Sequence, residues 1–381
     1  MDEPLDLSLI AIFRDLPDPR IDRRKRHLLE DVITIAILAV ISGADYWTEI
    51  EDYGRSKQAW LATFLELPNG IPSHDTFGRI FAHLDPKAFR ESFARWVEAL
   101  RARIVSTSDE QQVAIDGKTS RRTGSPKADL GPLHVVSAWA VGHGLVLGQL
   151  ATEKKSNEIT AIPHLLDLIA VEGCVVTIDA MGCQHKIAKK IIDRGGDYLL
   201  AVKENQPELE ADVREFFEWA ERAAIAERPA IETNEMIDRE HGREERRVAS
   251  VSSDVAWLRG IGKKWKGVQS IVQIEAWRSE GETTSYERRY YISSLPAEAG
   301  RLNRLVRNHW GIENSLHWCL DIAFREDDSR VRTGNAAENF AILRHLAMNL
   351  LKQERTCKLG IKSKRRKAGW DDAYLLKVLA V

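Results

Sequence analysis

Two short apolar runs that each end in an aspartate constrain what this chain can fold into. Residues 111–119 read QQVAIDGKT, in which Val113, Ala114 and Ile115 lead directly into Asp116. Residues 173–182 read GCVVTIDAMG, in which a run of strand formers leads into Asp179. Apolar runs of this length are typical of buried strands. We expect each strand to present its last side chain at a sheet end, where α/β folds place their chemistry.

The two aspartates allow two interpretations. A single acid after a strand is often only a turn former or a helix cap. Two strands that bring one aspartate each to the same sheet end could instead hold a divalent metal ion between the carboxylates. Hard oxygen ligands of this kind favour Mg²⁺, which completes its coordination with water and phosphate oxygens.

Composition sets the broad class of protein. The chain has 381 residues and 44% hydrophobic content, enough for two or three domains with a sizeable core. The net charge of -2 gives no average nucleic-acid signature, although a local basic patch matters more than the mean. The four cysteines lack CxxC spacing, which argues against a zinc site. The N-terminus has no signal-peptide pattern, and Val32–Ile41 is too short to span a bilayer, so we expect a soluble cytoplasmic protein with no membrane partner.

Residues 1–105 predict a helical domain. The spacing or abundance of apolar residues predicts four helical segments. They are Leu28–Ile41, Trp47–Phe64, a segment that begins after the N-cap candidate Ser73, and Phe89–Ile104. The basic loop Asp15–Arg26 is either a solvated linker or an arm that contacts phosphates. This region shows no catalytic pattern, and it either binds DNA or packs on the strand-rich region after it.

The pattern changes to strands from Val113 onward. A hairpin over residues 133–151 is followed by a helix, the Asp179 strand, a helix over residues 184–192 and a strand over residues 198–202. This order predicts an RNase H-like α/β fold, with a mixed sheet and helices on both faces. Residues of about 204–285 are predicted as a mainly β insertion that opens with a charged helix. A strand over residues 288–295 then returns to the sheet, and a helix over residues 299–320 comes after it.

A third acid, Glu313, lies in the middle of that last helix. It shares a Trp-rich face with His309, Trp310 and His317, so we expect it to be partly buried. A buried carboxylate needs a partner, which is either a salt bridge to an arginine such as Arg307 or a metal ion.

These residues resemble a known family. Asp116 in VAIDGKT, Asp179 in VVTIDAMG and Glu313 in HWGIEN resemble the three acids of bacterial DDE transposases, and specifically the ISAs-type group with the H-repeat-associated proteins. Further segments match in order, and the resemblance covers roughly residues 7–355. These segments are DPRIDRRKRH, ISGADYWTEIEDYG, GIPSHDTFGRIFAHLD, HGREERR (241–247) and FREDDSRVR (324–332).

The resemblance implies metal-dependent strand cleavage and strand transfer at insertion-sequence ends. Asp116 would lie between two Mg²⁺ ions, for which Mn²⁺ can substitute, with Asp179 and Glu313 each holding one. The implied partners are double-stranded DNA, as terminal inverted repeats and target, and a second copy of the chain on DNA. The protein would be nucleoid-associated when bound. The larger family often carries Y-x2-R-x3-E-x6-K around the third acid, whereas Val306, His309 and Leu320 stand here, so cationic contacts must come from elsewhere.

Several assignments stay open. Asp327 and Asp328 are the rivals of Glu313 as third ligand. Lys118 either balances the carboxylates or contacts a phosphate. The candidates for DNA contacts are Lys118, Arg121, Arg122, Lys186, Lys203, Arg307 and His309, with Lys189, Lys190 and His317 as further candidates.

The predicted domains are residues 1–105, the DDE domain 106–355 and a basic tail 356–381. The run KSKRRK (362–367) in the tail is either solvated or a DNA anchor. The alternative functions are an inactive DNA-binding relic, a plain metal-dependent nuclease or a two-carboxylate glycosidase.

Overall fold

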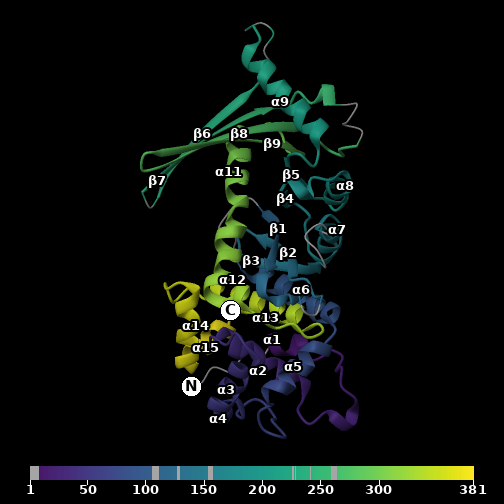
Figure 1. The fold of residues 1–381 in the computed structure, drawn as a ribbon, viewed down its shortest axis with the longest axis vertical. Coiled ribbons are helices and arrows are strands. Elements are labelled where there is room, and N and C mark those ends of the chain that lie inside the picture. The colour runs from purple at the N-terminus through teal and green to yellow at the C-terminus, as the bar shows by residue number, and fades with distance from the viewer. Residues whose placement is uncertain are drawn as a thin grey trace.

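The computed structural model describes residues 8–104, 111–126, 129–152, 158–224, 227, 229–240, 242–258 and 264–381. His241, the first residue of the HGREERR motif, lies outside these ranges. The chain forms an elongated molecule (Figure 1). Helices from both ends of the chain gather at one end, the first five strands lie in the middle, and four long strands extend at the other end.

The N-terminal region is helical, as predicted. Its helices are α1 (Ser8–Phe13), α2 (Leu29–Ile41), α3 (Trp47–Ser56), α4 (Gln58–Leu61), α5 (His74–His83) and α6 (Pro86–Arg103). The single helix predicted over 47–64 is interrupted at Lys57. Helix α6 begins earlier than predicted because the Asp85 carboxylate accepts hydrogen bonds from the amides of Lys87 and Ala88, at 3.0 and 3.4 Å.

One mixed sheet forms the centre of the fold. Its strand order is β3-β2-β1-β4-β5-β9-β8-β7-β6. The first five strands are β1 (Gln112–Ser120), β2 (Leu133–Ala140), β3 (Leu145–Thr152), β4 (Val175–Ile178) and β5 (Asp197–Val202). Strands β1 to β3 are antiparallel neighbours, whereas β1, β4 and β5 are parallel. This order and these directions are those of the RNase H-like fold, so the predicted fold class is confirmed.

Both faces of the sheet are covered by helices. Along β4, Val175 packs in the cluster with α11 (Ala299–His309), whereas Val176 packs in the opposite core. That opposite core includes residues of α7 (Glu158–Leu168), α8 (His185–Asp193) and α9 (Pro207–Arg222). Strands with two buried faces read as continuous apolar runs, which explains the sequence of β4.

The predicted insertion extends the same sheet. Its strands are β6 (Glu232–Glu240), β7 (Arg243–Ser252), β8 (Ser270–Glu280) and, on the return, β9 (Thr283–Ser293). Strand β9 pairs antiparallel with β5 and with β8, so the insertion is continuous with the central strands. The insertion opens with the charged helix α9, as predicted, and this helix ends at Arg222.

Asp116 does not end its strand, so that part of the sequence prediction is wrong. Strand β1 continues to Ser120 because it pairs with β2 as far as Ser120 and Leu133. Its parallel pairing with β4, however, stops at Ile115 and Ile178. Asp116 therefore lies one residue beyond the end of the parallel pairing, level with Asp179.

The predicted helix over 299–320 is also not continuous. Helix α11 ends at His309, a π-helical turn, η8, spans Glu313–His317, and α12 covers Trp318–Phe324. The chain then continues through α13 (Ala336–Gln353) to α14 (Ile361–Trp370) and α15 (Asp372–Leu379). π-Helical turns are rare and are frequently found at functional sites. Among the described residues, no helix is both long and apolar enough to cross a bilayer.

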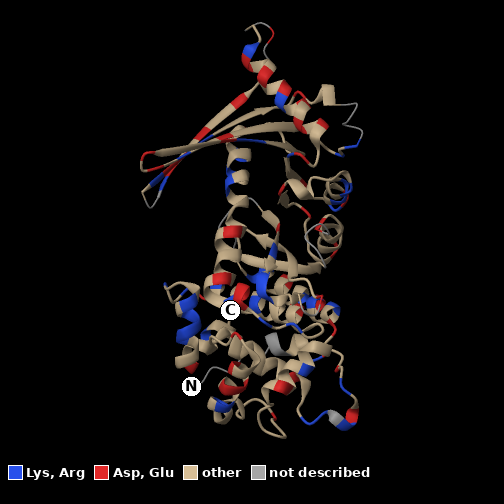
Figure 2. Cartoon of the chain, viewed as in Figure 1, with Lys and Arg blue, Asp and Glu red and all other residues tan. Residues whose placement is uncertain are grey.

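The basic run of the C-terminal region is a helix rather than a loose tail. Lysines and arginines gather on α14 (Figure 2), but Lys364 and Arg365 are buried. The Arg365 guanidinium donates to the carbonyls of Val40, Ala44 and Ala323, and to the Asp45 carboxylate at 2.9 Å. Neither solvation nor DNA anchoring, the two roles predicted for the run, applies to these two residues.

Arg365 therefore joins helix α14 to the N-terminal helices. We expect Arg365→Met to lower the free energy of unfolding by about 3–5 kcal/mol, because it leaves the buried Asp45 carboxylate without its cation. Arg366 is exposed on the same helix and gives the matched control Arg366→Met, with an expected change within about 0.5 kcal/mol. Urea unfolding of both variants measures the difference, and equal stabilities would contradict the structural role of Arg365.

Candidate active site

Three carboxylates from distant parts of the chain line one cavity of about 680 Å³. Asp116 comes from the middle of β1, Asp179 follows β4 directly, and Glu313 opens the π-helical turn after α11. The structure thus brings the three predicted acids to a single cavity. Their separation in the sequence means that the sheet and α11 together create the site.

The electrostatics of Asp116 reflect this crowding. Burial and, to a smaller extent, the nearby carboxylates of Asp179 and Glu313 together raise the pKa of Asp116 to about 7, against the lowering effect of the hydrogen bond from the Gly117 amide. His317 lies close, with 3.6 Å between its Nδ1 and Asp116 Oδ2. Burial lowers the pKa of His317 to about 3, so this ring is neutral and does not balance the charge.

The position of α11 relative to the sheet is set by a small polar network. The Gln112 side chain donates to Thr177 Oγ1 at 3.1 Å and to the carbonyl of Leu305 at 2.9 Å. Thr177 Oγ1 also lies 3.0 Å from Nδ1 of His309. Because these contacts join β1, β4 and the end of α11, they fix where Glu313 enters the cavity.

Glu313 itself is exposed, so the prediction of partial burial is wrong. The Trp-rich face does not enter the core as a unit: the Trp310 ring is half-buried, and the Arg289 guanidinium lies over it, 4.4 Å from the ring centre. The alternative partner for Glu313, Arg307, instead pairs with Asp238 at 3.0 Å. Glu313 therefore points its carboxylate to the open cavity.

Gly117, beside Asp116, is required by packing. Its φ is not positive, but a Cβ there would lie 2.4 Å from Glu158 Oε1 and 2.6 Å from His134 Nε2. These two side chains form a buried pair, with 2.6 Å between the same two atoms. A glycine therefore follows Asp116 because the His134–Glu158 pair packs directly against the strand at this position. The sequence alone had suggested that the glycine marks the end of the strand.

Lys118 is committed to acids outside the cavity. Its ammonium lies 2.7 Å from Asp321, 3.4 Å from Asp327 and 3.7 Å from Glu326. Asp328, the other rival for the third acid, pairs with Arg122 at 3.2 Å. Lys118 is thus paired with carboxylates, although these are not the three cavity acids. Neither Asp327 nor Asp328 is among the described residues that line the cavity.

The predicted basic residues divide into two groups. Lys203 and His309 line the cavity with the acids. Burial lowers the pKa of His309 to about 4, so it offers a neutral ring. The second group lies outside the cavity and consists of Arg121, Arg122, Lys186 and Arg307. Lys186 is exposed on α8.

Two arginines of the cavity were missed by the sequence analysis. Arg288 and Arg289 on β9 both line it. Arg288 pairs with Glu275 at 2.9 Å, and Arg289 with Glu287 at 2.6 Å. The stretch RRYYISSL was recognised as a strand, but only its antiparallel pairing with β5 shows that these residues reach the site.

The donor chemistry fits divalent cations. The three carboxylates supply the hard oxygen ligands that Mg²⁺ or Mn²⁺ prefers, and their mutual repulsion favours a bound cation. Within the part of the chain that the structure describes, no three His, Cys, Asp or Glu side chains already stand at ligand spacing.

Comparison with known proteins shows the family to which the chain belongs. The profile of the family described as "Transposase DDE domain" matches residues 107–350, and that of "DDE_Tnp_1-associated" matches residues 10–97. The chain therefore belongs to the DDE transposase domain family.

Relatives are similar over nearly the whole chain. "H repeat-associated putative transposase YhhI" of Escherichia coli K12 is 40% identical over 372 residues, covering 96% of each chain. "Putative protein YbfL" of the same organism is 41% identical with the same coverage. Among solved structures, a piggyBac transposase synaptic complex with hairpin DNA aligns with a TM-score of 0.43 and 11% identity, covering 96% of this chain and 77% of the other.

The packing around Gly117 gives a direct test of the site's construction. We expect Gly117→Ala to lower the free energy of unfolding by about 1–3 kcal/mol, because the added methyl group overlaps the His134–Glu158 pair. Gly311 offers a matched control, since no atom lies within 4 Å of a Cβ built there. Gly311→Ala is expected to leave stability unchanged or raise it by up to about 1 kcal/mol. Thermal unfolding compares the two, and equal changes would contradict the packing account.

Proposed function

We propose that this protein is an active DNA transposase that cleaves and joins DNA strands at the ends of an insertion sequence. One observation carries the proposal: carboxylates from β1, from the residue after β4 and from the turn after α11 line a single cavity in a chain of the DDE transposase domain family. Double-stranded DNA is the proposed substrate, as both element ends and target, bound by a dimer of the chain.

In this proposal the three carboxylates are the ligands of the divalent cations that the reaction needs. Asp116, Asp179 and Glu313 would hold two Mg²⁺ ions, or Mn²⁺ in their place, and these ions would supply the positive charge that activates the attacking oxygen and stabilises the leaving 3′-oxygen. The chain's own residues supply binding and positioning around this centre. Lys203, on the cavity wall, contacts a phosphate near the cleaved bond in this proposal.

The remaining lining residues suit the same reaction. Arg288 and Arg289 are held by carboxylate partners, so their guanidinium groups are fixed at the cavity wall. The neutral His309 ring, tied to Thr177, positions the end of α11. The attacking oxygen comes from water or a DNA 3′-hydroxyl, and no protein nucleophile is required.

Removal of one acid tests the proposal. We expect Asp116→Asn to lower the cleavage rate by about 10³-fold or more, equivalent to about 4 kcal/mol of lost transition-state stabilisation. The variant should unfold at the same or a higher temperature, because burial beside two carboxylates disfavours the Asp116 charge. The measurement is cleavage of end-labelled DNA that carries the element boundary, with Mg²⁺ or Mn²⁺. The same loss is expected for Asp179→Ala and Glu313→Ala.

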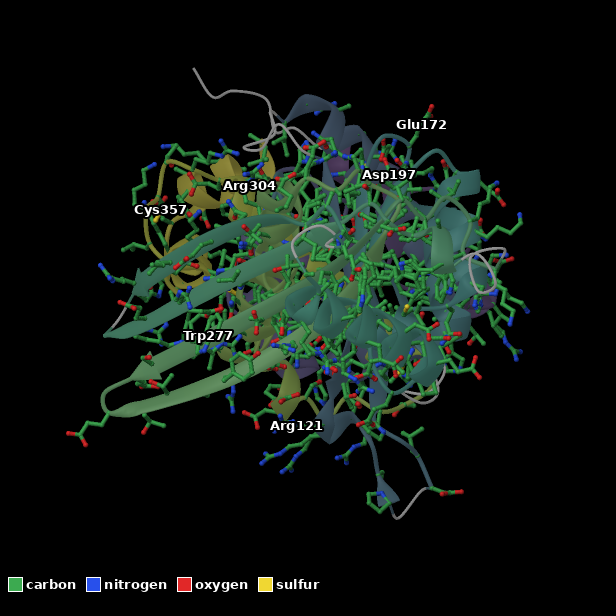
Figure 3. The ribbon with its side chains drawn as sticks, turned by 90° about the horizontal axis from the view of Figure 1, so that it is seen from above. Arg121, Glu172, Asp197, Trp277, Arg304 and Cys357 are labelled. Carbon is green, nitrogen blue, oxygen red and sulfur yellow. The ribbon has the colours of Figure 1, made fainter. Side chains whose placement is uncertain are left out.

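The control acid lies away from the cavity. Glu172 precedes β4 and points outward (Figure 3), so Glu172→Ala is expected to cleave at the wild-type rate. Near-normal cleavage by any of the three site variants would remove that acid from the assignment. Binding without cleavage by the wild type would favour the inactive DNA-binding relic, and cleaved products without joined strands would favour a nuclease.

A further inference from the structure

Three sequence segments that contain none of the three site acids come together around a second cavity, of about 500 Å³. They are ISGADYWTEIEDYG (41–54), GIPSHDTFGRIFAHLD (70–85) and FREDDSRVR (324–332), which lie far apart in the sequence. Each contributes lining residues, including Trp47, Arg79 and Arg330. The cavity lies at the junction between the N-terminal helices and the loop before α13.

The lining is strongly cationic. Arg79, Arg330 and Arg332 are all exposed there. Among the described residues that form the lining, Asp75 is the one carboxylate, and its side chain is 77% exposed beside His74. In a chain whose net charge is only -2, three arginines facing one carboxylate form a local positive surface.

The walls of the cavity are fixed by packing. The Trp47 ring stacks on Phe81 at 5.1 Å and meets Phe340 edge-on at 4.9 Å. Gly334 has a φ of 51°, and a Cβ there would lie 2.5 Å from the carbonyl oxygen of Ala82. The loop that carries the arginines therefore fits tightly against the end of α5, which holds the cationic surface in place without a ligand.

The cationic surface continues to the strand of Asp116. The Arg332 guanidinium donates to the carbonyl of Arg122 at 2.8 and 3.2 Å. Arg121 and Arg122 follow β1 directly. Their side chains are 81% and 59% exposed, and they pair with Asp327 at 3.1 Å and with Asp328 at 3.2 Å. Arg121 projects outward from the molecule (Figure 3). At about 3.3 Å per strand residue, Arg121 lies roughly 16 Å from Asp116 along β1.

We propose that this second cavity, together with Arg121 and Arg122, binds the phosphate backbone of duplex DNA beyond the cleaved bond. A spacing of roughly 16 Å corresponds to about five base steps at about 3.4 Å each. Exposed guanidinium groups on rigid walls recognise phosphates through their charge and paired N–H donors. The inference rests on the proposed function, because it takes the substrate to be DNA. It assigns the N-terminal helices a part in holding that DNA.

The test is DNA binding as a function of salt. For the variant Arg79→Ala/Arg330→Ala, we expect the slope of log K against log salt to become shallower by about 1.8, which is about 0.9 for each lost phosphate contact. Affinity should fall by at least tenfold for all sequences alike. Hydroxyl-radical footprinting of the same duplex should lose protection at a site away from the cleaved phosphate. The variant Arg79→Lys/Arg330→Lys retains the charges and is expected to recover most of the affinity.

The matched control is Arg222→Ala, an arginine of α9 whose side chain is 75% exposed and which does not line this cavity. It should leave slope and footprint unchanged. An unchanged slope and footprint in Arg79→Ala/Arg330→Ala, with the wild type still cleaving, would overturn this inference alone. Arginine-dependent binding by a wild type that never cleaves would uphold the inference and count against the proposed function.

Discussion

The repulsion among three carboxylates in one cavity is the constraint on which the rest of this structure depends. A buried carboxyl such as Asp116 is disfavoured in its charged form, and two neighbouring acids increase the penalty. Such a site persists only where the surrounding fold holds it. Here the support comes from the network of Gln112, Thr177 and His309, which joins two strands to α11. The acids are therefore kept together by contacts in which they take no part.

The sheet and its helices provide this support over a long distance. Nine strands in one sheet connect the insertion to the central strands, so Arg288 and Arg289 on β9 reach the same cavity as Asp116 on β1. At the other end of the molecule, the buried Arg365 joins the C-terminal helix to the carbonyl groups at the end of α2. Each connection joins segments that are distant in the sequence. The loss of one such residue therefore removes contacts between several elements of the fold.

The apolar patterns of the sequence predicted the two strands that carry or precede the site aspartates. The runs before Asp116 and Asp179 identified their strands because a strand buried on both faces must be apolar throughout. Glu313 was identified by resemblance, but its exposure depends on a π-helical turn that no periodicity indicates. Lys118 was placed near the acids, yet its partners Asp321, Glu326 and Asp327 lie more than 200 residues away. Such pairings result from tertiary packing, and a single sequence does not contain them.

Those same ion pairs relate the acid cavity to the second, cationic one. Lys118 lies two residues from Asp116 and binds Asp321, Glu326 and Asp327, which belong to α12 and the segment that continues to Arg330. The ammonium is nearly buried, so these contacts are screened less by solvent than surface pairs. The loop that carries the exposed arginines is thereby fixed to the strand that carries Asp116. A duplex bound along the arginines would hold a constant position relative to the acids, which is the condition that cleavage at one defined phosphate requires.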